Sequence, residues 1–215
     1  MNSLIVIDFA GTLIKPEIIE EANQFRTQIL ERSLPTKMDH SQPESLYQVN
    51  RGFVEKLTGL NKKLMIKYLT NTQNEITLPA EKIQNQISTN LFQIGMYMAA
   101  KKHKRDIFPT GLISVLEKIK DKNYQLAIIS GVRRDIISGM LQIAEIDKLF
   151  DYIKGQPPIL GTSNEQQLIE LERKGKIIAV IGDKLSDLEP AEKIKAKTVF
   201  VKWGHSSGGE EKFAD

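Results

Sequence analysis

The sequence lacks cysteine altogether. This absence excludes disulfide bridges, thiolate nucleophiles and cysteine-based zinc sites. Long apolar runs are also missing, and none approaches the roughly 20 residues that a membrane helix needs. The chain opens directly on a short strand-like run, without a basic leader or a small-residue cleavage site, so we expect no signal peptide. These features together predict a cytoplasmic protein with no membrane partner.

Charge of one sign is not in large excess. The 215 residues carry 30 Lys and Arg against 27 Asp and Glu, a net charge of +3. The most basic segment, "KKHKRD" at 101–106, is short and is typical of a solvated helix end. We therefore expect no nucleic-acid partner.

Five short apolar runs predict β-strands. They are continuous rather than alternating, which is typical of strands buried on both faces of a parallel sheet. Helical patterns alternate with the last four runs, and this order favours a doubly wound α/β fold. The predicted strands are residues 3–9, 125–130, 151–154, 177–182 and 198–203. The predicted helices beside them are residues 109–120, 134–143, 163–173 and 187–194.

The stretch from residue 15 to residue 105 shows no convincing strand. Four helical patterns fill it, at residues 17–32, 45–57, 61–68 and 80–101. We predict an α/β core formed by residues 1–14 and 106–215, with residues 15–105 as an inserted helical domain. An apolar face on this insert could be covered by the core or by a second chain, so a homodimer stays open.

Acidic and polar residues stand where the predicted strands end. Asp8 ends the first strand, Ser130 the second and Lys154 the third, while Asp183 and then Asp187 follow the fourth. Ligands of parallel α/β sheets bind beyond the carboxyl ends of the strands. Carboxylates that gather there repel one another unless a cation intervenes. Magnesium, which prefers oxygen ligands, would meet that need.

Three motifs carry a resemblance to a known family. They are "IDFAGTL" (7–13), "AIISGVRRDII" (127–137) and "VIGDKLSDLEPAEK" (180–193). The chain resembles the haloacid-dehalogenase superfamily of phosphatases and phosphotransferases. The resemblance implies a three-layer Rossmann-like core with a helical cap domain, and Mg²⁺-dependent hydrolysis of a small phosphorylated metabolite.

The resemblance also assigns a nucleophile and a metal site. Asp8 would attack phosphorus and form an aspartyl-phosphate. Asp8, Asp183 and the backbone carbonyl of Ala10 would bind Mg²⁺, with Asp187 as a further ligand.

Phosphate contacts are implied in the same way. Ser130 and the amide of Gly131 would hold a phosphoryl oxygen, and the Gly11–Thr12 turn would bring the backbone close to the phosphate. A lysine would neutralise the charge shared by the nucleophile and the phosphoryl group. The family's usual lysine position is not matched here, and Lys154 is the best substitute because it lies at a strand end.

Arg133 follows the Ser-Gly turn at the start of a predicted helix. A basic side chain at that end opposes the helix dipole. Its position therefore hints at an anionic ligand.

Ala10 is the main departure from the family pattern. Most phosphatases of the superfamily have a second aspartate at this position, which protonates the leaving group and activates water; such catalysis contributes roughly a hundred- to ten-thousand-fold. Three hypotheses stay open. A phosphatase could act on a good leaving group or take its acid/base from the insert, with Glu20, Glu21, His40 and Glu55 as candidates.

The second hypothesis is a phosphonatase-like enzyme. The motif D-x-A-G-T resembles that of phosphonoacetaldehyde hydrolase, whose chemistry uses a Schiff base on a cap lysine. The candidate lysines here are Lys56, Lys62, Lys63 and Lys67. The third hypothesis is a phosphate-binding or interaction module without turnover.

Overall fold

The computed structural model describes residues 3–33, 80–156, 163–204 and 208–214. Two of the predicted helices, residues 45–57 and 61–68, lie outside the described residues. The chain divides into two compact units, Met1–Glu20 with Ala99–Asp215, and Glu21–Met98. The core and cap boundaries expected from the sequence, at residues 14 and 106, stay predictions.

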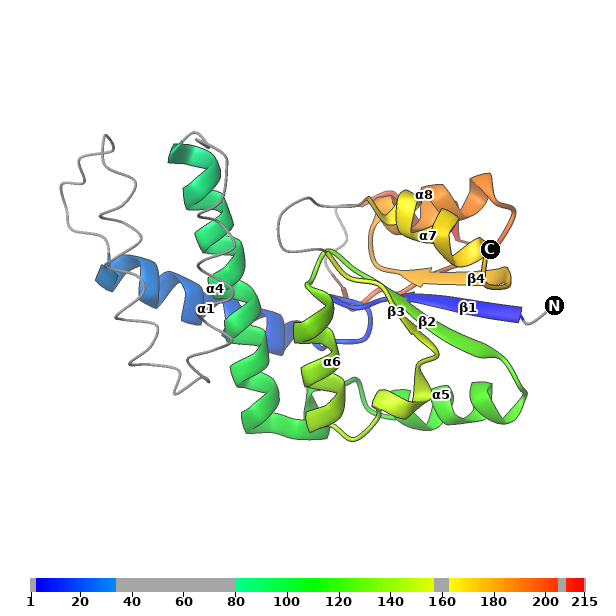
Figure 1. The fold of residues 1–215 in the computed structure, drawn as a ribbon, viewed down its shortest axis with the longest axis horizontal. Coiled ribbons are helices and arrows are strands. Elements are labelled where there is room, and N and C mark those ends of the chain that lie inside the picture. The colour runs from blue at the N-terminus through cyan, green and yellow to red at the C-terminus, as the bar shows by residue number, and fades with distance from the viewer. Residues whose placement is uncertain (1–2, 34–79, 157–162, 205–207, 215) are drawn as a thin grey trace. The chain divides into compact units, whose positions relative to one another are not determined.

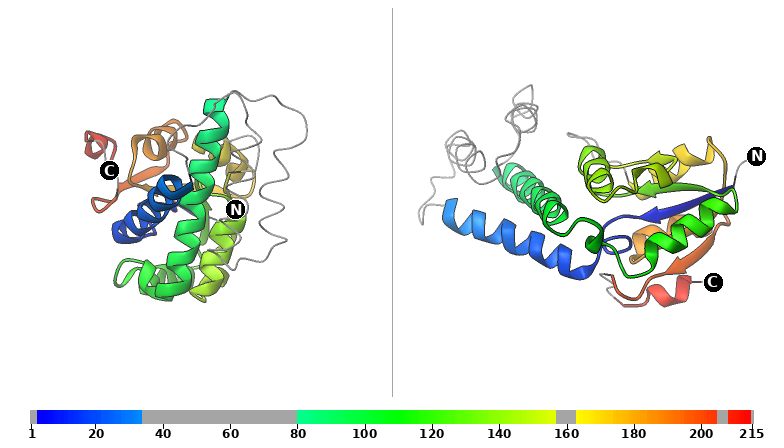
Figure 2. Two further views of the ribbon diagram at one scale, coloured as in Figure 1. Left: turned by 90° about the vertical axis from the view of Figure 1, so that its left-hand side faces the viewer. Right: turned by 90° about the horizontal axis from the view of Figure 1, so that it is seen from below.

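The first unit is built on a five-stranded parallel sheet, which confirms the predicted α/β class (Figure 1). The strand order is β3-β2-β1-β4-β5, so the N-terminal strand lies in the middle (Figure 2). The strands are β1 Ser3–Asp8, β2 Gln125–Ile129, β3 Tyr152–Ile153, β4 Lys176–Gly182 and β5 Lys197–Phe200.

Helices cover both faces of this sheet and complete the expected three layers. In Figure 1, α5 (Leu112–Asp121) and α6 (Arg134–Ile143) lie on one face, and α7 (Asn164–Glu172) and α8 (Leu185–Lys193) on the other. The strands bury continuous apolar sequence between these layers, as expected for a parallel sheet. One core cluster joins β1, β2 and β4 to α7 and α8 through Leu4, Val6, Ala127, Ile129, Leu168, Leu171, Val180 and Ala191.

Strand register decides which residues meet at the carboxyl edge. Asp8 on β1 pairs with Ile129 on β2, and Ile7 pairs with Ile181 on β4. The residues that follow β1, β2 and β4 therefore emerge side by side, although they lie far apart in the sequence.

Most element ends lie within one or two residues of the prediction, and two of them differ by three. Helix α5 begins at Leu112 rather than at residue 109, because Gly111 precedes it with a φ of +81°, a conformation that glycine adopts without a Cβ clash. Strand β5 stops at Phe200, so Trp203 lies in the turn beyond it rather than in the strand.

The second unit contains most of α1 (Pro16–Ser33) and α4 (Ala80–His103), which lie side by side (Figure 2). Their close approach depends on small residues, because a Cβ added at Gly95 would lie 2.9 Å from the Cα of Ala22. Ile29, Leu91 and Ile94 form a small apolar cluster nearby. Among the described helices, none combines the length and apolar character needed to cross a membrane.

The two ends of the predicted insert, residues 15–105, lie close together within the first unit. The amide of Lys15, just after the first motif, donates to the carbonyl of Ile107 at 2.9 Å. Ile107 ends the short 3-10 helix η1 (Lys104–Ile107), which follows α4. This hydrogen bond joins the segments of chain at the two ends of the predicted insert.

Candidate active site

Three carboxylates converge at the carboxyl edge of the sheet. Asp8 ends β1, Asp183 directly follows β4, and Asp187 lies in the first turn of α8. Each offers an oxygen within 4.8 Å of the others. Their relative exposures are 6%, 0% and 2%, so this is a buried acidic cluster.

Burial and mutual repulsion make the cluster electrostatically unfavourable without a cation. Burial raises the pKa of Asp8 well above its ordinary value, and the charges of Asp187 and Asp183 raise it further. Burial also raises the pKa of Asp187, with a second contribution from Asp183. An isolated anionic cluster of this kind is costly unless it is paired or binds a metal. The donor set, three carboxylates and no nitrogen or sulfur, fits a hard divalent cation such as Mg²⁺.

Asp187 is oriented by neighbours on two sides. The backbone amide of Lys184 donates to its Oδ2 at 3.1 Å, which caps α8. From α7, the amide Nδ2 of Asn164 donates to its Oδ1 at 2.6 Å. A Cβ added at Gly182 would lie 2.5 Å from the Cβ of Asp187, so the end of β4 must be glycine for this packing. Sequence reasoning missed Asn164, because its partner lies 23 residues away on another helix.

The loop after β1 also reaches the cluster. Gly11 has a φ of +98°, which explains why this turn contains glycine. The hydroxyl of Thr12 is buried and donates to Oδ1 of Asp183 at 3.4 Å, a long contact. Thr12, expected beside the phosphate, thus also contacts a metal-ligand candidate. The metal role of the Ala10 carbonyl stays a prediction.

Ser130 is fixed at the end of β2 by a second residue that the sequence did not reveal. Its backbone N–H donates to Oε1 of Gln167 at 3.2 Å, and its carbonyl accepts from Nε2 of the same side chain at 3.2 Å. The side chain of Gln167, 2% exposed on α7, thus pairs with both backbone groups of Ser130. The hydroxyl oxygen of Ser130 accepts from the amide of Val132 at 3.1 Å.

The residues after Ser130 present an open turn and an ordered guanidinium. A Cβ added at Gly131 would meet no atom within 4 Å, so there is space above this turn. The side chain of Arg133 is nine-tenths buried, and its guanidinium makes a bidentate pair with Asp135, at 3.0 and 2.9 Å. Asp135 therefore holds Arg133 in one geometry beside the Ser-Gly turn.

The two lysines of interest have different surroundings. The ammonium of Lys154 pairs with Glu170 on α7 at 2.6 Å, and this contact lowers the pKa of Glu170. Lys184 follows Asp183 directly, and its positive charge opposes the upward shift of the pKa of both Asp8 and Asp187. Among the described residues, Lys184 is thus a cation whose charge acts on the nucleophile candidate. Lys184 is the third residue of "GDKLSD", but the strand-end rule points to Lys154 and does not select it.

Several candidates from the insert stay untested. His40, Glu55 and the four lysines proposed for a Schiff base lie outside the described residues. Glu20 and Glu21 lie on α1. Their suggested roles as replacement acid/base groups remain predictions.

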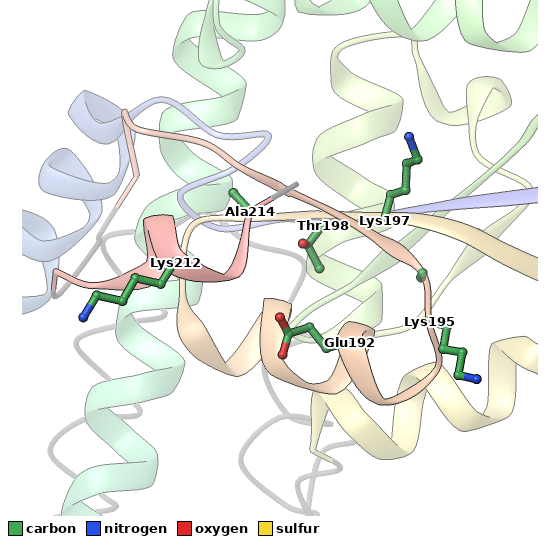
Figure 3. A pocket seen from close by; sticks show the side chains of 7 residues that line it. Glu192, Lys195, Lys197, Thr198, Lys212 and Ala214 are labelled. Atoms are coloured by element: carbon green, nitrogen blue, oxygen red, sulfur yellow. The ribbon is translucent and has the colours of Figure 1, made fainter.

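A cavity of about 400 Å³ lies away from the carboxylates, at the start of β5 and the end of α8. Figure 3 shows the side chains of Thr198 and Glu192 at its centre, with Lys195 and Lys212 pointing away from it. Because the start of a parallel strand lies at the opposite end from the carboxylate cluster, this cavity takes no part in the chemistry of that cluster.

Comparison with known proteins identifies the family. Residues 30–201 match the family model described as haloacid dehalogenase-like hydrolase. Since this match covers more than half of the 215 residues, the chain belongs to the haloacid dehalogenase-like hydrolase family. The chain is accordingly a hydrolase of this type. The match begins at residue 30, after the strand that carries Asp8, so it leaves the first motif untested.

Solved structures show the same fold at low sequence identity. A structure described as a predicted phosphoglycolate phosphatase from Haemophilus somnus 129pt has a TM-score of 0.59 at 16% identity, over 97% of this chain and 88% of that chain. A mutant of CbbY from Rhodobacter sphaeroides, in complex with xylulose-(1,5)bisphosphate, has a TM-score of 0.61 at 17% identity, over 100% and 92%. The HAD-hydrolase YfnB from Bacillus subtilis, bound to magnesium, has a TM-score of 0.54 at 9% identity, over 93% and 88%. No curated protein matches the sequence.

Proposed function

We propose that this hydrolase is a Mg²⁺-dependent phosphatase that acts on a small phosphorylated metabolite through an aspartyl-phosphate on Asp8. The buried triad of Asp8, Asp183 and Asp187, beside the Ser130 turn, carries the proposal. Asp8, at the end of the central strand, would then be the nucleophile, and all three carboxylates would hold the cation.

In the first step, an oxygen of Asp8 attacks phosphorus. A bond forms between this oxygen and phosphorus, and the bond from phosphorus to the ester oxygen breaks with its electron pair leaving on that oxygen. Mg²⁺, when bound by Asp8, Asp183, Asp187 and the Ala10 carbonyl, would supply positive charge beside the phosphoryl oxygens. Ser130 and the Gly131 amide donate hydrogen bonds to a phosphoryl oxygen.

The positive charge of Lys184 favours the ionised, nucleophilic form of Asp8 against the effect of burial on its pKa. We propose that Lys184 takes the role that the sequence pattern assigned to Lys154, whose ammonium is paired with Glu170. Arg133 is proposed as a further contact to an anionic part of the substrate, because its guanidinium is ordered next to the Ser-Gly turn.

In the second step, water attacks phosphorus, the bond to Asp8 breaks, and inorganic phosphate leaves with the carboxylate restored. Ala10 has no group that can protonate the ester oxygen in the first step or activate water in the second. The proton for the ester oxygen then comes from solvent. This favours substrates whose leaving group is stable as an anion.

Kinetics with a generic aryl phosphate test the proposal. The wild-type protein is expected to release phosphate with Mg²⁺ and to stop when the metal is chelated. Asp8→Asn is expected to lower kcat by several orders of magnitude, about 10⁴-fold or more, because the nucleophile is lost. Unchanged Mg²⁺-dependent hydrolysis by Asp8→Asn would refute the proposal.

Two other results would favour the remaining hypotheses. Borohydride trapping of an aldehyde substrate on Lys56, Lys62, Lys63 or Lys67 would point to the phosphonatase-like reaction. Metal binding without turnover on any phosphorylated compound would point to a binding module. The cytoplasmic location and a homodimer rest on the sequence alone and stay predictions.

A further inference from the structure

Trp203, the only tryptophan of the chain, contacts the loop that follows the nucleophile strand. Its indole Nε1 donates to the backbone carbonyl of Thr12 at 3.1 Å, across 191 residues of sequence. The hydroxyl of Thr12 in turn donates to Asp183. A residue beyond the last strand is therefore connected through one loop residue to a metal-ligand candidate.

Gly204, the next residue, contacts the same carboxylate directly. A Cβ added at Gly204 would lie 2.2 Å from the Cβ of Asp183 and 2.5 Å from its Oδ2. Real side chains essentially never approach so closely. Any side chain at position 204 would therefore force Asp183 or the loop to move.

Burial does not explain the position of the Trp203 side chain. Its side chain is 46% exposed, among the most exposed large apolar residues of the described chain. It follows β5 in a turn that is tied to the sheet by the amide of Val201, which donates to the carbonyl of Gly182 at 3.0 Å. A hydrogen bond to the first-motif loop, rather than apolar packing alone, accounts for its orientation.

We propose that Trp203 and Gly204, here called the 203–204 clasp, are positioning residues for the metal site. The indole holds the backbone of Thr12, and the bare Cα of Gly204 sets the side-chain position of Asp183. The clasp thus fixes the spacing between the loop after β1, which begins next to Asp8, and the loop after β4, which contains Asp183. The inference rests on the metal site of the proposed function, but it concerns metal affinity rather than turnover.

Metal affinity is the direct test. Free Mn²⁺, measured by electron paramagnetic resonance during titration of the whole protein, serves as the probe for the Mg²⁺ site. Trp203→Phe keeps an aromatic ring but removes the N–H donor, and is expected to weaken Mn²⁺ binding roughly three- to tenfold, the effect of one hydrogen bond. Gly204→Ala is expected to weaken it more strongly, because Asp183 must shift.

Lys202→Ala provides the matched control in the same turn. Its side chain is 80% exposed and lies 3.8 Å from Glu211. We expect its Mn²⁺ affinity to stay within about twofold of the wild type, as for most exposed substitutions. Unfolding midpoints measured in chelator separate a loss of affinity from a loss of folding.

A clasp with a merely structural role would behave differently. In that case Trp203→Phe and Gly204→Ala would lower the unfolding midpoint but bind Mn²⁺ like the wild type, and the proposal would be overturned.

The fluorescence of Trp203 adds a second readout, because the indole contacts the site through Thr12. We expect saturating Mg²⁺ to shift the wild-type emission and to leave Asp183→Asn unchanged; a wild-type emission unaffected by bound Mg²⁺ would contradict the coupling.

The clasp proposal and the phosphatase proposal can fail independently of each other. If the wild type binds Mn²⁺ without hydrolysing any phosphate ester, and Trp203→Phe binds it more weakly, the clasp stands and the phosphatase proposal falls. If the wild type hydrolyses phosphate esters and both clasp variants bind Mn²⁺ normally, the phosphatase stands and the clasp falls.

Discussion

At position 10 a methyl group stands where most phosphatases of this family have a carboxylate. The proposed metal site does not need that carboxylate, because Asp8, Asp183 and Asp187 already converge within 4.8 Å. Under the proposed function, the alanine removes a source of protons for the leaving group. The sequence alone already poses this question as one of proton transfer, and it stays a prediction.

Ala10→Asp should show how much catalytic efficiency is lost because residue 10 is alanine. We expect the wild type to prefer aryl over alkyl phosphates, because only a stabilised leaving group departs without protonation. Ala10→Asp is expected to raise kcat/KM for alkyl phosphates by roughly 10²- to 10⁴-fold and to change that for aryl phosphates much less. Rates across phosphate esters with a range of leaving-group pKa values measure the effect. A wild type equally fast on both classes, and unaffected by the substitution, would show that another group supplies the proton.

Lys184 and Lys154 can be distinguished by removing each charge in turn. Lys184→Met is expected to lower kcat/KM about 10²- to 10³-fold, the usual scale for removing one preorganised electrostatic contact. Lys154→Met should change it by less than about threefold, because this ammonium is paired with Glu170. Lys195→Met, at an exposed position, controls for the loss of one positive charge. A large loss with Lys154→Met and a small loss with Lys184→Met would instead support Lys154, which was proposed because it lies at a strand end.

At the scale of elements, hydrophobic pattern predicted most of the α/β core. The helix at residues 134–143 was predicted with the observed ends, and the five strands were located to within a few residues. The capping box of Ser163 and Gln166 lies within four consecutive residues, and local contacts of this kind are the ones that a sequence pattern reveals. The ends of elements that are set by tertiary contacts were harder to predict. Strand β5, for example, stops at Phe200, where the chain turns toward the site.

The site was predictable only where it follows a local motif. Asp8, Asp183 and Asp187 each stand at a strand end or helix start that the sequence pattern reveals. Asn164 and Gln167 look like ordinary polar residues of a helix, and their partners are set by how α7 packs on the sheet. No spacing rule along the chain encodes such contacts, so only the assembled fold reveals them.

Gln167→Leu tests how strongly α7 supports the end of β2. The substitution leaves the buried N–H and C=O of Ser130 without their side-chain partner, so we expect a loss of about 1–3 kcal/mol in the free energy of unfolding. Urea unfolding measures the loss, with Ile169→Gln on the exposed side of the same helix as a control expected within about 0.5 kcal/mol of the wild type. A stability equal to that of the control would mean that these hydrogen bonds add nothing.

For the whole molecule, the acidic cluster couples folding to pH and to metal. The pKa values of Asp8 and Asp187 are higher in the folded chain than the ordinary value. The folded chain therefore binds more protons than the unfolded chain in the window between the ordinary and the raised values. Without metal, this contribution to stability is complete below the ordinary pKa and is lost as the pH rises through the raised values.

Asp8→Asn should accordingly stabilise the metal-free protein at pH 7, because it removes one of three repelling charges. It should also flatten the decline in unfolding midpoint between about pH 4 and pH 7, the region above the ordinary aspartate pKa. Added Mg²⁺ should stabilise the wild type, by roughly 2.7 kcal/mol at a hundred times the Kd, and Asp8→Asn far less. Thermal unfolding with and without chelator measures both effects.

Glu117→Gln, on the exposed surface of α5, is the control for a single charge removed. It should keep both the pH dependence and the Mg²⁺ response of the wild type. A metal-free Asp8→Asn protein less stable than the wild type at pH 7 would contradict the raised pKa of Asp8.

The most direct test of the central claim is to trap the phosphoryl group on the protein. The wild type is mixed with an aryl phosphate and Mg²⁺, quenched in acid during turnover, reduced with borohydride, and digested for mass spectrometry. A β-aspartyl phosphate is reduced to homoserine, so we predict homoserine at position 8, formed only when substrate and Mg²⁺ are both present. Turnover with Asp8 intact, or with the phosphoryl group on another residue, would contradict the account.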